Sequence, residues 1–180
     1  MHLNCIYTTY FRTIMQFQEG KEKFLHAWGT LGSDWGINRT MAQVHALLLI
    51  APSAMCAEEI MAELQISRGN ANMNLRSLLD WGLIYKEIKP GDRKEYFVAE
   101  KDMWTVVRQI ILHRKKKELD PIVKLLNELS DVDPVCEKSE EFCKTVREIK
   151  LFTSKADSTL DTLVNADSNW FLGTFLKLIR

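Results

Sequence analysis

Between residues 66 and 99, the hydrophobic and polar positions predict a helix followed by a β-hairpin. Apolar side chains recur here at three- and four-residue spacing, which places them on one face of a helix. These are Ala71, Leu75, Leu78 and Leu79. Ser67 precedes the helix as its N-cap, and Gly82 follows it as a C-terminal stop. Two short runs suited to strands, 83–89 and 95–99, then flank a turn that contains Pro-Gly.

Two further helices are expected before this one. A capping box at residues 40–43 predicts a helix from Met41 that stops before Pro52. Cys56 stands at the N-cap of the next helix, whose first turn is acidic, as the helix dipole favours. The order helix, helix, short turn, helix, hairpin is that of a winged helix-turn-helix. We therefore predict a mainly α fold, with three helices and a two-stranded β-wing at residues 37–99.

Amphipathic helices are expected on both sides of this module. Apolar residues within 14–35 recur at spacings of three, four or seven. From Phe142 to Leu163 they alternate spacings of four and three, which forms the seam of a helical interface. One helix cannot bury such a stripe alone. We therefore expect an N-terminal arm and dimerisation helix at residues 1–36 and a C-terminal helical dimerisation region at residues 100–180.

The C-terminal region is expected to begin with a helix from Glu100 or Asp102, which a run of four cations at 114–117 closes. Its inward side chains are predicted to be Met103, Trp104, Val107, Ile110 and Ile111. The Asp-Pro pairs at 120–121 and 133–134 each begin a helix or kink a long one. A last apolar segment covers residues 170–179, and the conformation of residues 1–13 stays open between an extended arm and a helical turn.

Composition narrows the class of protein. The 180 residues are 46% hydrophobic and 27% charged, a balance typical of a folded chain. The 24 basic and 24 acidic residues cancel, which argues against a protein that coats nucleic acid by bulk charge. No run reaches the roughly 18 apolar residues that span a bilayer, and the N-terminus does not resemble a signal peptide. We therefore expect a cytoplasmic protein without a membrane partner.

The polar side of the predicted helix and the hairpin tip carry the candidate chemistry. No acidic residue interrupts this side before Asp80, and its side chains suit phosphates and base edges. Residues 65–99 hold six basic and four acidic residues, a modest positive balance. The predicted DNA-binding residues are Ser67, Arg68, Asn70, Asn72, Met73 and Arg76 on the helix, and Lys89, Arg93 and Lys94 on the hairpin.

No motif of catalysis is present. The chain contains no P-loop, GxSxG or HExxH sequence, and its four histidines are scattered. We expect no enzyme, no cofactor and no metal site. His45 is interpreted as a core residue and His113 as a surface residue. The four cysteines form no CxxC pair, which favours ordinary thiols over a disulfide framework.

With these residues identified, the chain resembles the MarR-type winged-helix transcription regulators, and within them the GbsR-like branch. The segments that carry the resemblance are Gly36–Leu47, Ala57–Met61, Ile66–Arg76, Asp80–Leu83 and Gly91–Phe97. It covers roughly residues 15–120. The resemblance implies a homodimeric repressor bound to double-stranded DNA at an inverted-repeat operator. The recognition helix would enter the major groove, with Arg68, Asn70, Asn72 and Arg76 facing it, and Arg93 would be the wing-tip arginine.

The resemblance also implies a small-molecule effector held between the dimerisation helices and the winged helix, such as a choline-like osmolyte. The aromatic residues expected beside it are Phe24, Trp28, Trp35 and Trp104. Tryptophan faces attract quaternary ammonium groups. The same aromatic spacing is usually that of an ordinary core, and both interpretations stay open.

Two other functions compete with DNA regulation by an effector. The modest charge suits a winged helix that docks a protein partner instead of DNA. Cys56 occupies an N-cap position where the family has Ser or Thr, and helix N-termini lower the pKa of a thiol. A redox-sensing regulator built on the same fold is therefore the third hypothesis.

Overall fold

The computed structural model describes residues 16–133 and 135–166. Seven α-helices, one π-helical turn (η1) and three short strands follow one another in this part of the chain. Their order is α1 (Phe17–Asp34), α2 (Arg39–Ile50), β1 (Met55–Cys56), α3 (Ala57–Leu64), α4 (Arg68–Asp80), β2 (Ile84–Glu87), β3 (Tyr96–Ala99), α5 (Met103–Arg114), η1 (Lys115–Leu119), α6 (Asp120–Leu129) and α7 (Glu137–Asn165).

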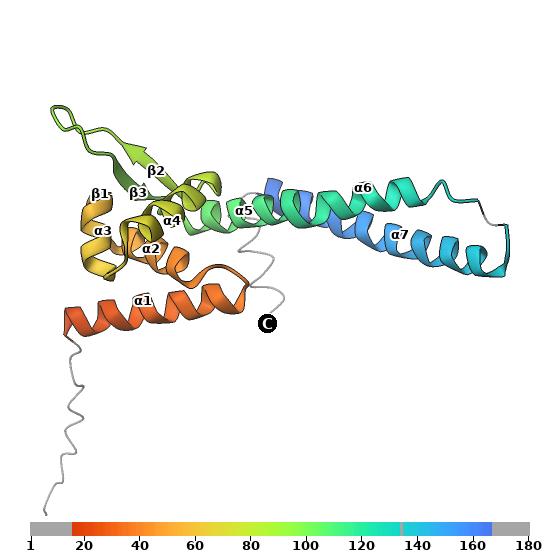
Figure 1. The fold of residues 1–180 in the computed structure, drawn as a ribbon, viewed down its shortest axis with the longest axis horizontal. Coiled ribbons are helices and arrows are strands. Elements are labelled where there is room, and N and C mark those ends of the chain that lie inside the picture. The colour runs from red at the N-terminus through yellow and green to blue at the C-terminus, as the bar shows by residue number, and fades with distance from the viewer. Residues whose placement is uncertain (1–15, 134, 167–180) are drawn as a thin grey trace, which may run out of the picture.

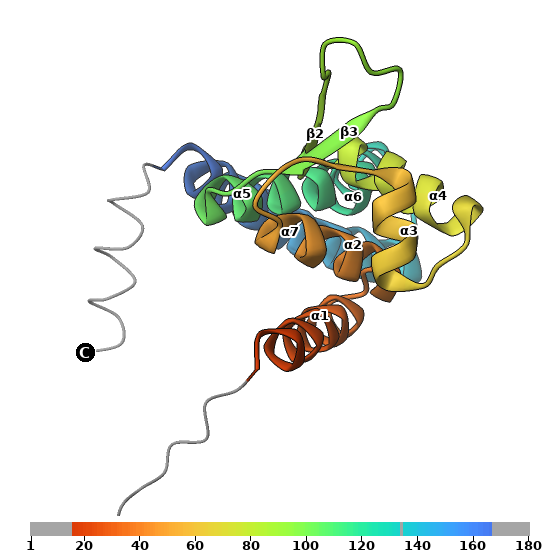
Figure 2. The same ribbon diagram turned by 90° about the vertical axis from the view of Figure 1, so that its left-hand side faces the viewer.

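The elements form a winged helix-turn-helix lobe with a long helical extension. In Figure 1, α1 to α4 and the sheet gather at one end, while α5 and α6 run away from them with α7 alongside. The loop between β2 and β3 stands out from the lobe on the opposite side from α1 (Figure 2). The expected winged helix-turn-helix fold is therefore confirmed. It exposes one side of α4 together with the β2–β3 hairpin.

The core lies around α2. Leu48 is buried there with Ile60 of α3, Leu75 and Leu78 of α4, and Val106 of α5. The stripe predicted on α4 supplies much of this core, because its period matches the helix. Because the apolar side of α4 packs against several helices, α4 is held in the lobe and its other side faces solvent.

The sheet has three strands in the order β1-β3-β2, all antiparallel. The sequence predicts a two-stranded wing, and β1 is the addition: Met55 pairs with Phe97 and Cys56 with Tyr96. A strand of two residues is too short to show an alternating hydrophobic pattern, so the sequence alone does not predict this pairing. β1 nevertheless ties the start of α3 to the base of the wing.

Two predicted helix starts are wrong. The side chain of Asn38 accepts a hydrogen bond from the Met41 N–H at 3.1 Å, so α2 begins at Arg39 rather than after Thr40. α7 begins after Cys136, not at the Asp-Pro pair 133–134. In both places an alternative cap a few residues away completes the first turn, which is a common source of error at helix ends.

The run of four cations does not close a helix. α5 continues through η1 into α6, so Arg114 to Lys117 lie in the middle of a long helical segment and Pro121 follows the irregular turn. Lys115 Nζ lies 3.0 Å from an Asp157 oxygen and 2.8 Å from an Asp161 oxygen on α7. Lys115 of the charge run therefore ties two helices together. At 120–121, α6 begins at Asp120 with Pro121 in its first turn, and it continues the irregular helical segment that starts with α5.

The predicted apolar faces of the extension are only partly buried. On α5, Val106 is buried in the core, whereas Met103 and Val107, which were expected to face inward, are exposed. On α7 the seam residues Val146 and Thr153 are buried, but Phe142 and Ile149 remain nearly half exposed. One part of the seam therefore packs against neighbouring helices of this chain, and the other part remains exposed.

Some expectations fall on residues outside the described part of the chain: the arm at 1–13, Pro134 and the apolar segment 170–179. Within the described part, no helix has the length and apolar character needed to cross a membrane.

Candidate nucleic-acid interface

The turn between α3 and α4 sets the position of the recognition helix. Gln65 ends α3 in the left-handed conformation, with φ of 52°. Ser67 then begins α4, and its hydroxyl accepts a hydrogen bond from the Asn70 N–H at 3.3 Å, as predicted. The cap satisfies one of the free N–H groups of the first turn and fixes where the helix starts.

The two faces of α4 differ as the sequence predicts. Five of the predicted DNA-binding residues at the start of and along α4 are exposed, and Met73 among them is 56% exposed. The other four are Ser67, Arg68, Asn72 and Arg76. A side chain added at Gly69 would meet nothing within 4 Å, so a partner's backbone can approach closely there. Among the predicted residues of α4, only Asn70 is partly buried, and its side chain is hydrogen-bonded to Asn74.

Asn74 is a functional candidate that the sequence analysis did not identify. Its side chain is on the buried side of α4 and only 2% of the residue is exposed. Asn74 Nδ2 donates to the backbone oxygen of Asn70 at 2.8 Å and to the Asn70 side-chain oxygen at 2.6 Å. The signal that was available is the four-residue spacing of two asparagines, which places them one turn apart on the same side of a helix.

Glu58 of α3 also enters this surface without having been predicted. Its carboxylate lies 3.6 Å from the guanidinium of Arg68. Its own backbone N–H lowers the pKa of Glu58 most, with smaller contributions from Lys94 of the wing and from Arg68. The Glu58 carboxylate therefore interacts electrostatically with a cation of α4 and with one of the wing.

The wing is braced by its own side chains. The Tyr96 hydroxyl donates to Asp92 at 2.7 Å, and Asp92 also accepts the Lys94 N–H at 3.0 Å. The Asp92 carboxylate raises the pKa of Tyr96 to about 12, and the same hydrogen bond lowers the pKa of Asp92. Lys89 Nζ lies 3.7 Å from the centre of the Tyr96 ring, a cation–π contact.

The three predicted wing residues therefore differ in their surroundings. Lys89 rests on the Tyr96 ring and is partly buried. Arg93 and Lys94 are exposed at the tip, beyond the turn that Gly91 makes with φ of 83°. The arrangement offers two outward cations on a stiffened loop beside α4.

The lowered thiol pKa that would support the alternative of a reactive Cys56 is not found. The residue is 3% exposed where β1 pairs with β3, and burial raises the pKa of its thiol. The Glu59 carboxylate accepts the Cys56 N–H at 2.7 Å, and the Cys56 sulfur accepts the Glu59 N–H, so the two residues form a capping box. The cysteine whose pKa is lowered is Cys136, through a hydrogen bond with Ser139 at the start of α7, far along the chain from the recognition helix.

His113 is not the surface residue that its position beside the cations suggests. Its ring stacks on Trp81 with centroids 4.2 Å apart, and burial lowers its pKa. Trp81 directly follows α4, so this stack joins the end of the recognition helix to α5. The sequence offered no signal for it, because the two rings are distant along the chain.

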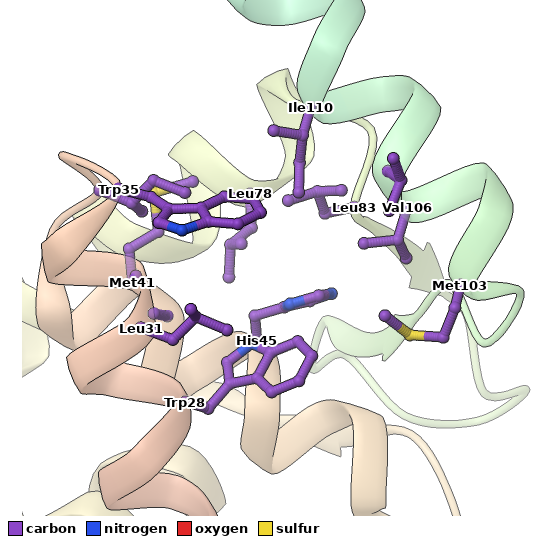
Figure 3. Close-up of a pocket in the computed structure, with 14 residues that line it drawn as sticks. Trp28, Leu31, Trp35, Met41, His45, Leu78, Leu83, Met103, Val106 and Ile110 are labelled. Carbon is purple, nitrogen blue, oxygen red and sulfur yellow. The ribbon is translucent and has the colours of Figure 1, made fainter. Parts of the chain in front are cut away.

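A second feature, an apolar cavity of about 180 Å³, lies between α1, α2, α4 and α5. Figure 3 shows His45 of α2 projecting between Trp28 of α1 and Met103 of α5. His45 is buried, as predicted, and burial lowers its pKa to about 4, so the ring is neutral at neutral pH. Its Nε2 is buried without a hydrogen-bond partner.

The four aromatic residues expected around an effector are not all brought together. Trp28 and Trp35 line the cavity. Phe24 packs against Trp28, with ring centroids 5.4 Å apart, but does not line it, and neither does Trp104. None of the residues that line the cavity is acidic.

Comparisons with known proteins agree with this geometry. Residues 35–95 match the model of the MarR family. A solved structure described as "Crystal Structure of a transcriptional regulator" is 20% identical, with a TM-score of 0.63 over 81% of this chain and 95% of that chain. No curated protein matches the sequence. The family match covers α2 to the wing, and the structural match covers 81% of this chain.

Proposed function

We propose that this chain is a sequence-specific DNA-binding transcription regulator without enzymatic activity, and that it acts as a repressor. The observation that carries the proposal is the exposed polar face of α4, with Arg68, Asn72 and Arg76, beside two outward cations of a braced wing. Such a helix fits the major groove, and such a hairpin reaches the neighbouring backbone. The resemblance of the run at residues 67–74 supports a finer assignment, to the GbsR-like branch of the MarR-type regulators.

A homodimer is part of this proposal. The helical extension leaves large apolar side chains exposed on α6 and α7. They are Ile122, Leu125, Phe142, Ile149, Leu151 and Phe152. Exposed apolar surface of this kind marks interfaces in folded proteins. A second copy would cover it and present two recognition helices, so the operator would be an inverted repeat.

Selection of bound sequences from a random duplex pool tests the proposal. Enrichment of an inverted repeat, with affinity that falls as salt rises, is the expected result. A pool that stays unenriched at low salt would contradict DNA regulation. It would favour the competing function, a winged helix that docks a protein partner.

Arg93 gives a prediction of its own. Because its side chain is exposed at the wing tip, we expect it to contact phosphate rather than a base edge. Arg93→Ala should weaken binding to all duplexes nearly equally and reduce the slope of log affinity against log salt by about 1. Mobility-shift titrations at several salt concentrations measure both, with Lys124→Ala on α6 as the control. A loss confined to one operator sequence would contradict a phosphate-contacting role.

We also propose that a small molecule in the cavity controls operator binding. The cavity is lined by residues of α1, α2 and α5 and by Leu78 of α4, so an occupant can alter how the recognition helix sits. A choline-like cation would find the faces of Trp28 and Trp35 there. The lining offers no carboxylate, however, and its buried His45 Nε2 suits a hydrogen bond to an uncharged molecule. An uncharged effector with one polar group is therefore favoured.

Toluene and benzyl alcohol test this preference, because they differ by one hydroxyl and suit an apolar cavity of this size. Binding followed by calorimetry should favour benzyl alcohol more in the wild type than in His45→Phe, by about 5- to 10-fold in the ratio of the two affinities. Choline is the charged comparison. Tight binding of choline with none of benzyl alcohol would contradict the uncharged effector and support the ammonium cage.

A further inference from the structure

The pair Asn70–Asn74 has a fixed hydrogen-bond polarity. Asn74 Nδ2 donates to the backbone oxygen of Asn70, at 2.8 Å. A backbone oxygen only accepts hydrogen bonds, so the nitrogen end of the Asn74 amide must face it. The reversed amide would bring two oxygens together inside the protein, where unpaired polar groups are costly. The orientation of Asn74 therefore follows from the helix backbone itself.

The orientation of Asn70 follows from that of Asn74. The same Asn74 nitrogen donates to the side-chain oxygen of Asn70 at 2.6 Å. If the Asn70 amide were reversed, two NH2 groups would face each other, and neither can accept a hydrogen bond. Asn70 thus turns its oxygen inward, toward a residue that is only 2% exposed, and keeps its NH2 group for the outside.

This polarity matters for base recognition. An asparagine that reads adenine uses both ends of its amide, accepting from N6 and donating to N7. An asparagine whose oxygen is directed into the protein presents its NH2 group, a donor, to the groove. Guanine presents two acceptors in the major groove, N7 and O6, whereas cytosine presents a donor at N4.

We propose that Asn74 is a specificity-determining positioning residue, which makes Asn70 a donor-only reader that selects guanine over adenine at one position of each half-site. The inference rests on the proposed DNA-binding function. Asn74 itself touches no base, because its side chain is buried beneath the helix.

Duplex selection with the wild-type 180-residue chain and its variants tests it. Asn70→Ala identifies the base pair that depends on Asn70. At that pair the wild type should prefer guanine over adenine by about tenfold. Asn74→Leu keeps a buried side chain of similar size but frees the Asn70 amide, so the preference should fall to within about threefold. Asn74→Ala is the second variant if Asn74→Leu does not fold, and Ser77→Ala on the same helix is the control.

The outcomes separate the inference from the function on which it rests. If the wild type enriches no duplex, the proposed function fails. If it enriches an operator but prefers adenine at the Asn70-dependent pair, the inference is wrong and the function stands. The same conclusion holds if no pair depends on Asn70, or if Asn74→Leu keeps the full guanine preference. A purely structural role for Asn74 would change affinity at all positions, not the preference at one.

Discussion

We expect Arg76→Ala to bind the selected operator at least about tenfold more weakly than the wild type, with the proposed dimer intact. Arg76 is exposed on α4 one turn after Asn72, on the side that faces away from the core. A bidentate contact from arginine to guanine contributes about 1–3 kcal/mol, and a dimer makes it twice. Asn72→Ala should also weaken binding, by a smaller factor, because an amide carries no net charge.

Mobility-shift titration measures this effect, and size-exclusion chromatography checks the dimer. Lys124→Ala is the matched control, since Lys124 is an exposed cation on α6, far along the chain from α4. Operator affinity unchanged in both Arg76→Ala and Asn72→Ala would show that this side of α4 is not the reading surface.

Leu78→Ala should lower the free energy of unfolding by about 3 kcal/mol. Leu78 is 0% exposed and packs within the core that holds α4 to α2 and α5. Truncation of a buried leucine to alanine costs about 2–5 kcal/mol, from lost burial and from the cavity left behind. Because Leu78 also lines the apolar cavity between the lobe and the extension, the variant should enlarge that space.

Urea unfolding measures the loss, with Met73→Ala as the control on the same helix. Met73 is 56% exposed, so its truncation should change the free energy of unfolding by less than about 0.5 kcal/mol. Equal losses in the two variants would mean that the helix is not anchored through its Leu78 side.

The parts of the fold that were predicted well depend on neighbours along the chain. The Ser67 cap and the apolar stripe of α4 are set by spacings of three and four residues, so they are visible without the rest of the protein. The same holds for the exposed cations at the wing tip. Helix boundaries were less certain, as Asn38 shows, because competing caps lie within two residues of one another.

The parts that were missed depend on contacts between distant segments. The pKa of Cys56 rises because β1 buries it against β3, although its place at a helix start favours the opposite shift. His113 stacks on Trp81 across 32 residues, and only two of the four aromatic residues expected around an effector reach the cavity.

By itself, the sequence determined the winged helix-turn-helix order and which side of α4 is polar, since periodicity and capping act within a few residues. Tertiary structure alone decided the third strand, the cavity with its unpartnered His45 and the burial of Asn74, which holds Asn70 in one orientation. The physical reason is burial: whether a polar side chain is solvated or held depends on surfaces that meet only when remote segments pack together.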